Sequence, residues 1–170
     1  MKTLFRSVLS ALGLWGFGAA ALRAEAVNEA EIVISTGLLT GLHHQESEQW
    51  MASVDYRLSE WRWGLRPWIG IAQAENRTTF ASVGLVYSYE TKNRVRFIAG
   101  FAPTFYERGN GRILGSKLEC YSFGEVGYAF KNDHVLSLRV GHLSNGGLGD
   151  INPGVETLLV TYSLPVMAKK

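Results

Sequence analysis

The sequence predicts an all-β protein, an eight-stranded antiparallel up-and-down transmembrane β-barrel, from three observations. First, about eight runs alternate apolar and polar residues with a period of two, the pattern of a β-strand with two unlike faces. Second, the runs reach the roughly 9–11 tilted residues that cross a bilayer, whereas strands of soluble sandwiches usually have about five or six. Third, short turns alternate with longer links, as in outer-membrane barrels.

The amino-terminal segment is distinct from the rest of the chain. A basic start precedes an apolar run from Val8 to Leu22, and the tripeptide Ala24-Glu25-Ala26 then matches a signal-peptidase site. The apolar run is shorter than the roughly 20 residues of a membrane-spanning helix. We therefore expect residues 1–26 to be a secretory signal peptide and residues 27–170 to form the barrel.

The alternation defines each strand in turn. From Trp50 to Leu58, for example, every second residue is apolar and the residues between them are mostly polar. The sixth run fits less well, because Ser122 and Gly124 fall on its apolar side, and its register stays open. The predicted strands are residues 30–40, 48–58, 63–73, 78–90, 94–107, 116–130, 134–144 and 155–165.

The connections and the aromatic residues favour a barrel over a soluble sandwich. Short turns are expected at Ser59-Glu60, Thr91-Lys92-Asn93 and Asn132-Asp133, and longer links after strands 1, 5 and 7. Aromatic residues gather near strand ends, as in the interfacial belts of membrane proteins. They are Trp61, Trp63, Tyr87, Tyr89, Tyr128, Phe130 and Tyr162.

A membrane barrel of this size places its polar faces inside. Eight strands leave an interior just wide enough for side chains, so no channel is expected. The charged residues expected inside have both signs and can pair there. They are Asp55, Arg57, Arg66, Arg96, Glu119, Glu125 and Arg139.

One stretch near the carboxyl terminus, Gly141 to Glu156, contains the residue types of a serine hydrolase. His142 and Ser144 share one strand face, since successive side chains alternate. If the last two strands pair with His142 opposite Glu156, the imidazole lies between a hydroxyl and a carboxylate. An imidazole can remove the serine proton, and a carboxylate on its other nitrogen stabilises the imidazolium. The alternative is a polar strand end that runs into a glycine-rich loop.

The loop between these residues offers hydrogen-bond donors. Asn145 and Asn152, with flexible backbone at Gly146 and Gly147, are candidates to stabilise a tetrahedral oxyanion. With a periplasmic amino terminus, this end of the barrel lies at the outer rim, and the site faces lipid on the barrel exterior. A membrane lipid is then the natural ester substrate.

The pattern H-x-S-N-x-G-L-x3-N-x-G-[IV]-E from His142 to Glu156 resembles the outer-membrane lipid A 3-O-deacylases, the PagL family of eight-stranded barrels. The signal, the length and the strand number resemble that family across the whole chain. The resemblance implies His142 as general base, Ser144 as nucleophile and Glu156 as the orienting carboxylate. The reaction would be hydrolysis of the ester-linked 3-hydroxyacyl chain at position 3 of lipid A.

The resemblance also extends to the loop and to the location. It implies oxyanion support from Asn152 and from backbone near Gly147, with Asn145 needed for site structure. The expected location is the outer membrane of a Gram-negative bacterium. The expected partners are lipopolysaccharide, through its lipid A, and outer-membrane lipid, and a homodimer remains open.

Two other functions stay in view. An outer-membrane phospholipase also presents an H-x-S-N-G motif on a barrel exterior, but it has about twelve strands and an asparagine where Glu156 stands here. A non-catalytic structural or adhesive barrel would leave the polar residues on a lipid face unexplained, because they cost energy there.

The remaining polar features are interpreted without a cofactor or metal. His43 and His44 lie in the first outer loop, but their spacing fits no zinc pattern well. Scattered basic residues and a formal net charge of +2 give no indication of nucleic-acid binding. Arg108, Arg112 and Lys117 surround a turn, and we interpret them as solvated loop charge, with contact to lipopolysaccharide phosphates as the alternative.

Overall fold

The structure, a computed structural model, describes residues 29–40 and 48–166. The predicted signal peptide, residues 1–26, and the histidines His43 and His44 lie outside these described residues. No helix in the described part of the chain is long and apolar enough to cross a membrane.

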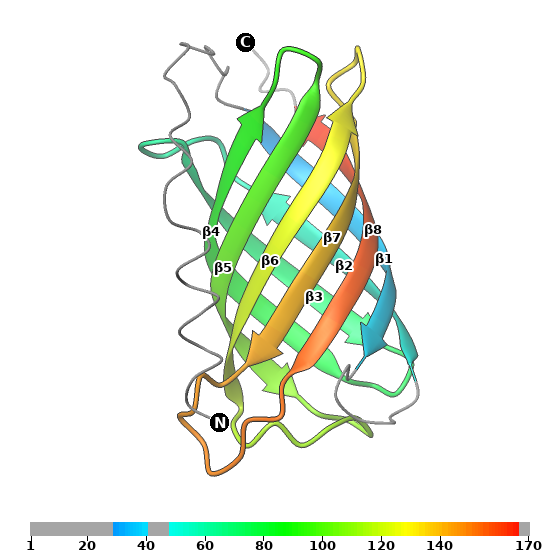
Figure 1. The fold of residues 1–170 in the computed structure, drawn as a ribbon, viewed down its shortest axis with the longest axis vertical. Helices are drawn as coiled ribbons and strands as arrows, with labels where there is room; N and C mark the ends of the chain where they lie inside the picture. Colours follow the sequence, from blue (N-terminus) through cyan, green and yellow to red (C-terminus); the bar gives the residue numbers. More distant parts are fainter. Residues whose placement is uncertain (1–28, 41–47, 167–170) are drawn as a thin grey trace, which may run out of the picture.

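Eight antiparallel strands close into a single barrel, which confirms the predicted fold class. Consecutive strands pair in chain order, and β1 completes the barrel by pairing with β8 (Figure 1). Closure gives every strand a partner on both sides, as lipid requires, because unpaired backbone groups are costly there. The strands are β1 (Ala30–Thr40), β2 (Gln49–Arg57), β3 (Leu65–Ala74), β4 (Thr79–Glu90), β5 (Val95–Glu107), β6 (Leu118–Ala129), β7 (Val135–Ser144) and β8 (Val155–Val166).

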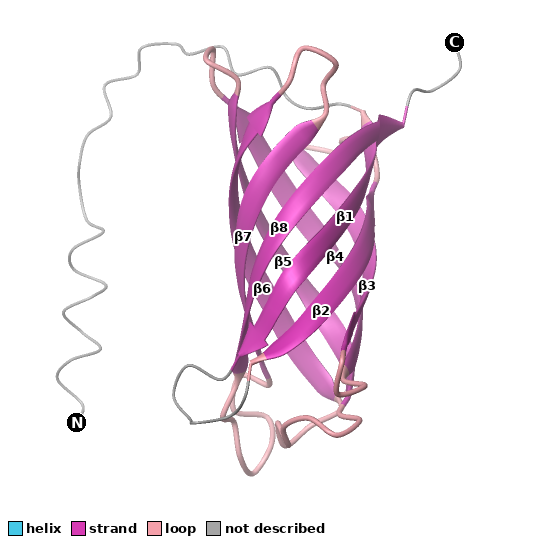
Figure 2. Cartoon of the chain, turned by 90° about the vertical axis from the view of Figure 1, so that its right-hand side faces the viewer, coloured by secondary structure: helices cyan, strands magenta, loops and turns pink. Residues whose placement is uncertain are grey.

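The two ends of the barrel differ. We call the end where β1, β3, β5 and β7 finish the loop end, and the opposite end the turn end; the loop end is at the bottom of Figures 1 and 2. At the loop end, residues 108–117 join β5 to β6 and residues 145–154 join β7 to β8. These two connections carry the groups discussed below.

Observed and predicted strand ends agree within two residues, and the largest differences are at the starts of β3 and β6. β3 begins at Leu65 instead of residue 63, because Trp63 and Gly64 both have positive φ, 56° and 78°. This turn is closed by the Gly64 N–H, which donates to Glu60 Oε1 at 2.7 Å. The link after β2 is therefore residues 58–64, longer than the short turn expected at Ser59-Glu60.

The outward faces are apolar and the inward faces are tightly packed. In β7, for instance, Leu136, Leu138 and Val140 are exposed while the residues between them are buried. An outer surface that is apolar over most of the barrel is what a lipid environment selects.

Charged residues fill the part of the interior toward the turn end. Glu31 lies in ion-pair contact with Arg57, Arg66 and Arg96. Each arginine thus faces a carboxylate, which offsets the large cost of removing a charge from water. All seven predicted interior residues are buried, and Glu31 joins them; Glu119, near the start of β6, is the member that lies toward the loop end. The set is Glu31, Asp55, Arg57, Arg66, Arg96, Glu119, Glu125 and Arg139.

Toward the loop end the interior is mainly apolar, which the sequence analysis did not predict. Leu39, Phe80, Tyr106, Leu143 and Val155 belong to one buried cluster there. Bulky side chains therefore close the barrel beneath the loops.

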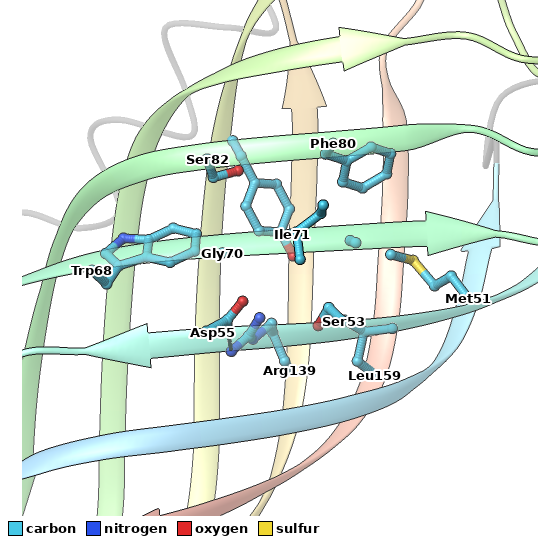
Figure 3. A pocket seen from close by; sticks show the side chains of 12 residues that line it. Met51, Ser53, Asp55, Trp68, Gly70, Ile71, Phe80, Ser82, Arg139 and Leu159 are labelled. Atoms are coloured by element: carbon cyan, nitrogen blue, oxygen red, sulfur yellow. Dashed lines mark hydrogen bonds and ion pairs between the residues drawn. The ribbon is translucent and has the colours of Figure 1, made fainter.

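A small cavity lies in the middle of the interior, where the charged and apolar parts meet. Asp55 and Arg139, 2.7 Å apart, line it together with Met51, Trp68 and Phe80 (Figure 3). Its volume of about 20 Å³ suits roughly one water molecule. Such a cavity is too small for a lipid acyl chain.

The register of β6 is now settled. Ser122 and Gly124 do face outward, opposite His142 and Val140 of β7. The irregularity in the sixth run is therefore a small, partly polar strip on the outer wall beside β7.

Candidate active site

His142 and Glu156 face each other on the outer surface of the β7–β8 hairpin. They are direct partners in the strand register, as the sequence predicted. His142 Nδ1 lies 3.4 Å from Glu156 Oε1. The His142 side chain is 49% exposed and that of Glu156 is 15% exposed. The imidazole thus remains partly accessible from outside the barrel.

Ser144 is the last residue of β7 and shares the outward face of His142. It is partly buried, and its register partner on β6 is Cys120. In the structure as described, no hydrogen bond joins Ser144 to His142. Strand geometry nevertheless puts the two residues only about 7 Å apart along β7.

Two glycines of the β7–β8 hairpin pack closely against neighbouring side chains, Gly154 against His142 and Gly141 against Tyr121. Gly154 has a φ of 65°, and a Cβ placed on it would lie 2.7 Å from His142 Cε1. The imidazole therefore packs directly on the Gly154 backbone. Gly141 points inward, where a Cβ would lie 2.5 Å from the Tyr121 hydroxyl. That hydroxyl and Thr157 Oγ1 hydrogen-bond at 2.8 Å on the inner side of the hairpin.

Asn145 holds the β7–β8 connection in place. Its side chain is fully buried, and Nδ2 donates to the carbonyl oxygens of Leu114 at 2.7 Å and Ile151 at 2.8 Å. Its Oδ1 accepts the Gly147 N–H at 2.8 Å. Both amide hydrogens are thus committed to backbone carbonyls. Asn145 is therefore a structural clamp in this conformation, and not the oxyanion donor that the residue pattern alone had suggested.

Asn152 is placed differently. It is exposed, and its Oδ1 accepts the backbone N–H of Asn145 at 3.0 Å. This bond fixes the orientation of the amide and leaves the donor nitrogen on the other side. The Gly147 N–H, by contrast, is already bound to Asn145 Oδ1. Of the loop donors named from the sequence, Asn152 Nδ2 is the one this geometry favours.

The connection between β5 and β6 supports the site, which the sequence did not reveal. Arg112 Nη1 donates to the Gly154 carbonyl at 3.3 Å, and the Tyr106 hydroxyl donates to the Arg112 carbonyl at 2.7 Å. Leu114 is buried and supplies a carbonyl to Asn145. In the sequence, this connection was marked by the Asn110-Gly111 turn signal and the basic residues around it, and neither indicated a contact with the β7–β8 hairpin.

The strip on β6 forms the other side of the site. Ser122 is the register partner of His142 and Cys120 that of Ser144. A Cβ added at Gly124, further along the strip, would meet nothing within 4 Å. The outer wall beside the pair is therefore open. Within the described residues, no group of three or more metal-ligating side chains is found.

Solved structures with this fold include membrane barrels of several kinds. The crystal structure of the outer membrane enzyme PagL matches with a TM-score of 0.64 and 20% sequence identity, covering 80% of this chain and 99% of that chain. A de novo designed transmembrane β-barrel matches with a TM-score of 0.59 and 11% identity, covering 82% and 96% of the two chains. Neisserial surface protein A follows at 0.57 and 10%, covering 81% and 96%. At these identities the likeness shows the fold alone.

Sequence comparison adds the family. None of the curated proteins matches the chain. The sequence model of the family described as lipid A 3-O-deacylase (PagL) matches residues 33–165, which includes all of the β7–β8 hairpin up to Pro165. This chain, an outer-membrane β-barrel of a Gram-negative bacterium, therefore belongs to the PagL family of lipid A 3-O-deacylases.

Proposed function

We propose that this protein hydrolyses the ester-linked 3-hydroxyacyl chain at position 3 of lipid A, with Ser144 as nucleophile, His142 as general base and Glu156 as the orienting carboxylate. The family description supplies the reaction class and the lipid. The residue roles are those that the pattern from His142 to Glu156 implies, and the geometry of the β7–β8 hairpin supports them.

The observation that carries the proposal is the pairing of His142 with Glu156 on the outside of a membrane barrel. Charged residues on a lipid-facing surface cost up to about 2–4 kcal/mol at the bilayer midplane but only about 0–1 kcal/mol near the interface. The pair lies at the loop end of its strands, where this cost is small. At that depth a histidine–carboxylate pair beside a serine costs the barrel little stability, and it is placed to act on a lipid.

The proposed reaction has two steps. Ser144 Oγ attacks the ester carbonyl while its proton passes to His142, and the sugar oxygen then leaves with that proton. This leaves an acyl-serine. Water, deprotonated by His142, attacks the acyl-serine and releases the free 3-hydroxy acid and the Ser144 hydroxyl. A serine–histidine hydrogen bond that is absent without substrate often forms only in the complex.

Glu156 and Asn152 support these steps from opposite sides. Glu156, at Nδ1, keeps the imidazole in the tautomer whose Nε2 can accept the serine proton. Asn152 Nδ2 would donate to the oxyanion, since its amide is already oriented by the Asn145 N–H. In this arrangement the loop end faces the outer leaflet, where lipopolysaccharide is found.

The test is the lipid A of a Gram-negative host that expresses the protein. Mass spectrometry should show loss of a single ester-linked 3-hydroxyacyl group, with the amide-linked chains retained. The Ser144→Ala variant, inserted to the same level, should leave lipid A unchanged. Unchanged lipid A with new lysophospholipid would favour the phospholipase, and no change in either pool would favour a non-catalytic barrel.

A further inference from the structure

A depression beside the catalytic loop contains two arginines that the proposed chemistry does not use. It lies between the β5–β6 and β7–β8 connections and is lined by Arg108, Arg112, Ile113, Ile151, Asn152 and Pro153. We infer that this depression binds a phosphate group on the lipid A headgroup and so positions the sugar over Ser144. The inference rests on the proposed function and deepens it.

The structure distinguishes the three basic residues of this connection, which the sequence could not. Lys117 Nζ lies 3.9 Å from Glu107 Oε2, and Lys117 does not line the depression. Arg108 and Arg112 both line it, and no acidic residue is among the described residues that do. Arginine suits a phosphate because its planar guanidinium can donate two parallel hydrogen bonds to two oxygens.

The backbone that carries these arginines is fixed. The Arg108 carbonyl accepts hydrogen bonds from Thr78 Oγ1 and from the Gly111 N–H, each at 2.8 Å. Arg112 is held on both sides, since its carbonyl accepts from Tyr106 and its Nη1 donates to Gly154. The bond to Gly154 orients the Arg112 guanidinium beside the β7–β8 connection. The Arg108 side chain remains exposed to an incoming headgroup.

The depression adjoins the reacting groups. Asn152 lines it and is also the proposed oxyanion donor, while Gly154 contacts both Arg112 and His142. Lipid A carries a phosphate on the same sugar ring as the ester at position 3. An anion held by the two arginines would therefore be separated from the scissile ester by no more than one ring.

The apolar part of the lining points to an amphiphile over a free ion. Ile113 is 57% exposed and Ile151 is 49% exposed, although both lie in loops at the water-facing end. Exposed apolar side chains next to two arginines fit a ligand that has a charged group beside a hydrophobic body.

The test compares two lipids that differ only in the sugar phosphate. Binding of lipid A, and of lipid A from which the phosphate on the reducing-end sugar has been removed, is measured with the inactive Ser144→Ala protein in detergent. Arg108→Gln in that background should weaken binding of the phosphorylated lipid about tenfold or more, the usual effect of losing a charge-assisted hydrogen bond. It should leave binding of the dephosphorylated lipid unchanged. Lys117→Gln is the matched control and should change neither.

Activity provides the second readout. With active protein, Arg108→Gln should raise KM for the phosphorylated lipid and leave kcat near its original value. Equal weakening on both lipids would mean that Arg108 supports the loop alone, and no weakening on either would remove the site; both results overturn the inference. If Arg108→Gln weakens binding of intact lipopolysaccharide but not of core-free lipid A, the arginines bind carboxylates of the core sugars. That result also overturns the inference. If the unmodified protein binds phosphorylated lipid A selectively but cleaves neither lipid, the proposed function fails while this inference stands.

Discussion

Ser122 of β6 lies directly opposite His142 of β7, and both side chains point out of the barrel. A small residue at this position leaves room for a substrate next to the imidazole. We expect Ser122→Leu to lower kcat/KM about tenfold or more by displacing the ester from the nucleophile, because small misplacements are costly in catalysis. Val126→Leu, on the same face of β6 but away from the site, should have no effect. Both variants are assayed for lipid A deacylation after equal insertion is verified, and equal activities would show that the strip is not near the substrate.

The three proposed catalytic residues should differ in the size of their effects. Ser144→Ala and His142→Ala should each lower turnover on the order of 10³-fold or more, by analogy with other triads. Glu156→Ala should cost less, since it orients the imidazole and does not react. Steady-state rates on purified lipid A provide the measurement. Near-normal hydrolysis by Ser144→Ala would show that the nucleophile is another group.

Gly154 should be sensitive to a single methyl group. In Gly154→Ala the new Cβ would lie 2.7 Å from His142 Cε1, so the imidazole must move away from its place beside Glu156. Gly146→Ala is the matched control, because Gly146 has nearly the same φ, 64°, but nothing within 4 Å of its Cβ. Both variants carry the strain of a left-handed residue, about 1–2 kcal/mol. Only Gly154→Ala should lose kcat, and equal losses would attribute the effect to backbone strain.

The two asparagines of the loop should separate structure from chemistry. Asn152→Asp keeps the oxygen that accepts the Asn145 N–H and loses the Nδ2 donor, so it should lower kcat by about 10²–10³ with the loop intact. Asn145→Ala removes three side-chain hydrogen bonds, to Leu114, Ile151 and Gly147, so it should loosen the loop itself. Limited proteolysis between β7 and β8 should detect this loosening in the second variant alone. Faster cleavage of Asn152→Asp would contradict the assignment.

The interior ion pairs should govern the stability of the barrel. Glu31→Gln leaves Arg57, Arg66 and Arg96 without their shared carboxylate, and breaking a buried pair costs about 3–5 kcal/mol. Glu119→Gln is the control, because neither carboxylate oxygen of this buried glutamate has a hydrogen-bond partner in the described part of the chain. Urea unfolding, followed by the gel mobility of unboiled samples, measures the difference. Similar midpoints for both variants would show that the cluster around Glu31 adds little stability.

The strands and their faces could be predicted because a period of two fixes both at once. Asp55 and Arg139 were assigned to the interior from alternation alone, and they lie there 2.7 Å apart. The pairing of His142 with Glu156 followed from the same rule, since the hairpin is local. The start of β3 was wrong by two residues, because the positive φ of Trp63 has no signal in the sequence pattern.

The environment of the site could not be predicted, because it is built from contacts distant in the chain. Nothing in the sequence shows that the Leu114 carbonyl accepts a hydrogen bond from the Asn145 side chain or that Arg112 donates one to the Gly154 carbonyl. The one available signal was the poor fit of Ser122 to a lipid-facing strand. A break in the alternation of a barrel strand is thus a useful marker of a neighbouring site.

The hydrogen bond from Asn145 to Leu114 has a consequence for when the protein can act. The β7–β8 hairpin carries all three proposed catalytic residues, but its loop is held by a backbone carbonyl of the β5–β6 connection. An unfolded chain in transit through the periplasm lacks that contact. Turnover would therefore begin only after insertion is complete. The appearance of activity would then report assembly of the barrel, and lipids that the unfolded chain meets before insertion would not be hydrolysed.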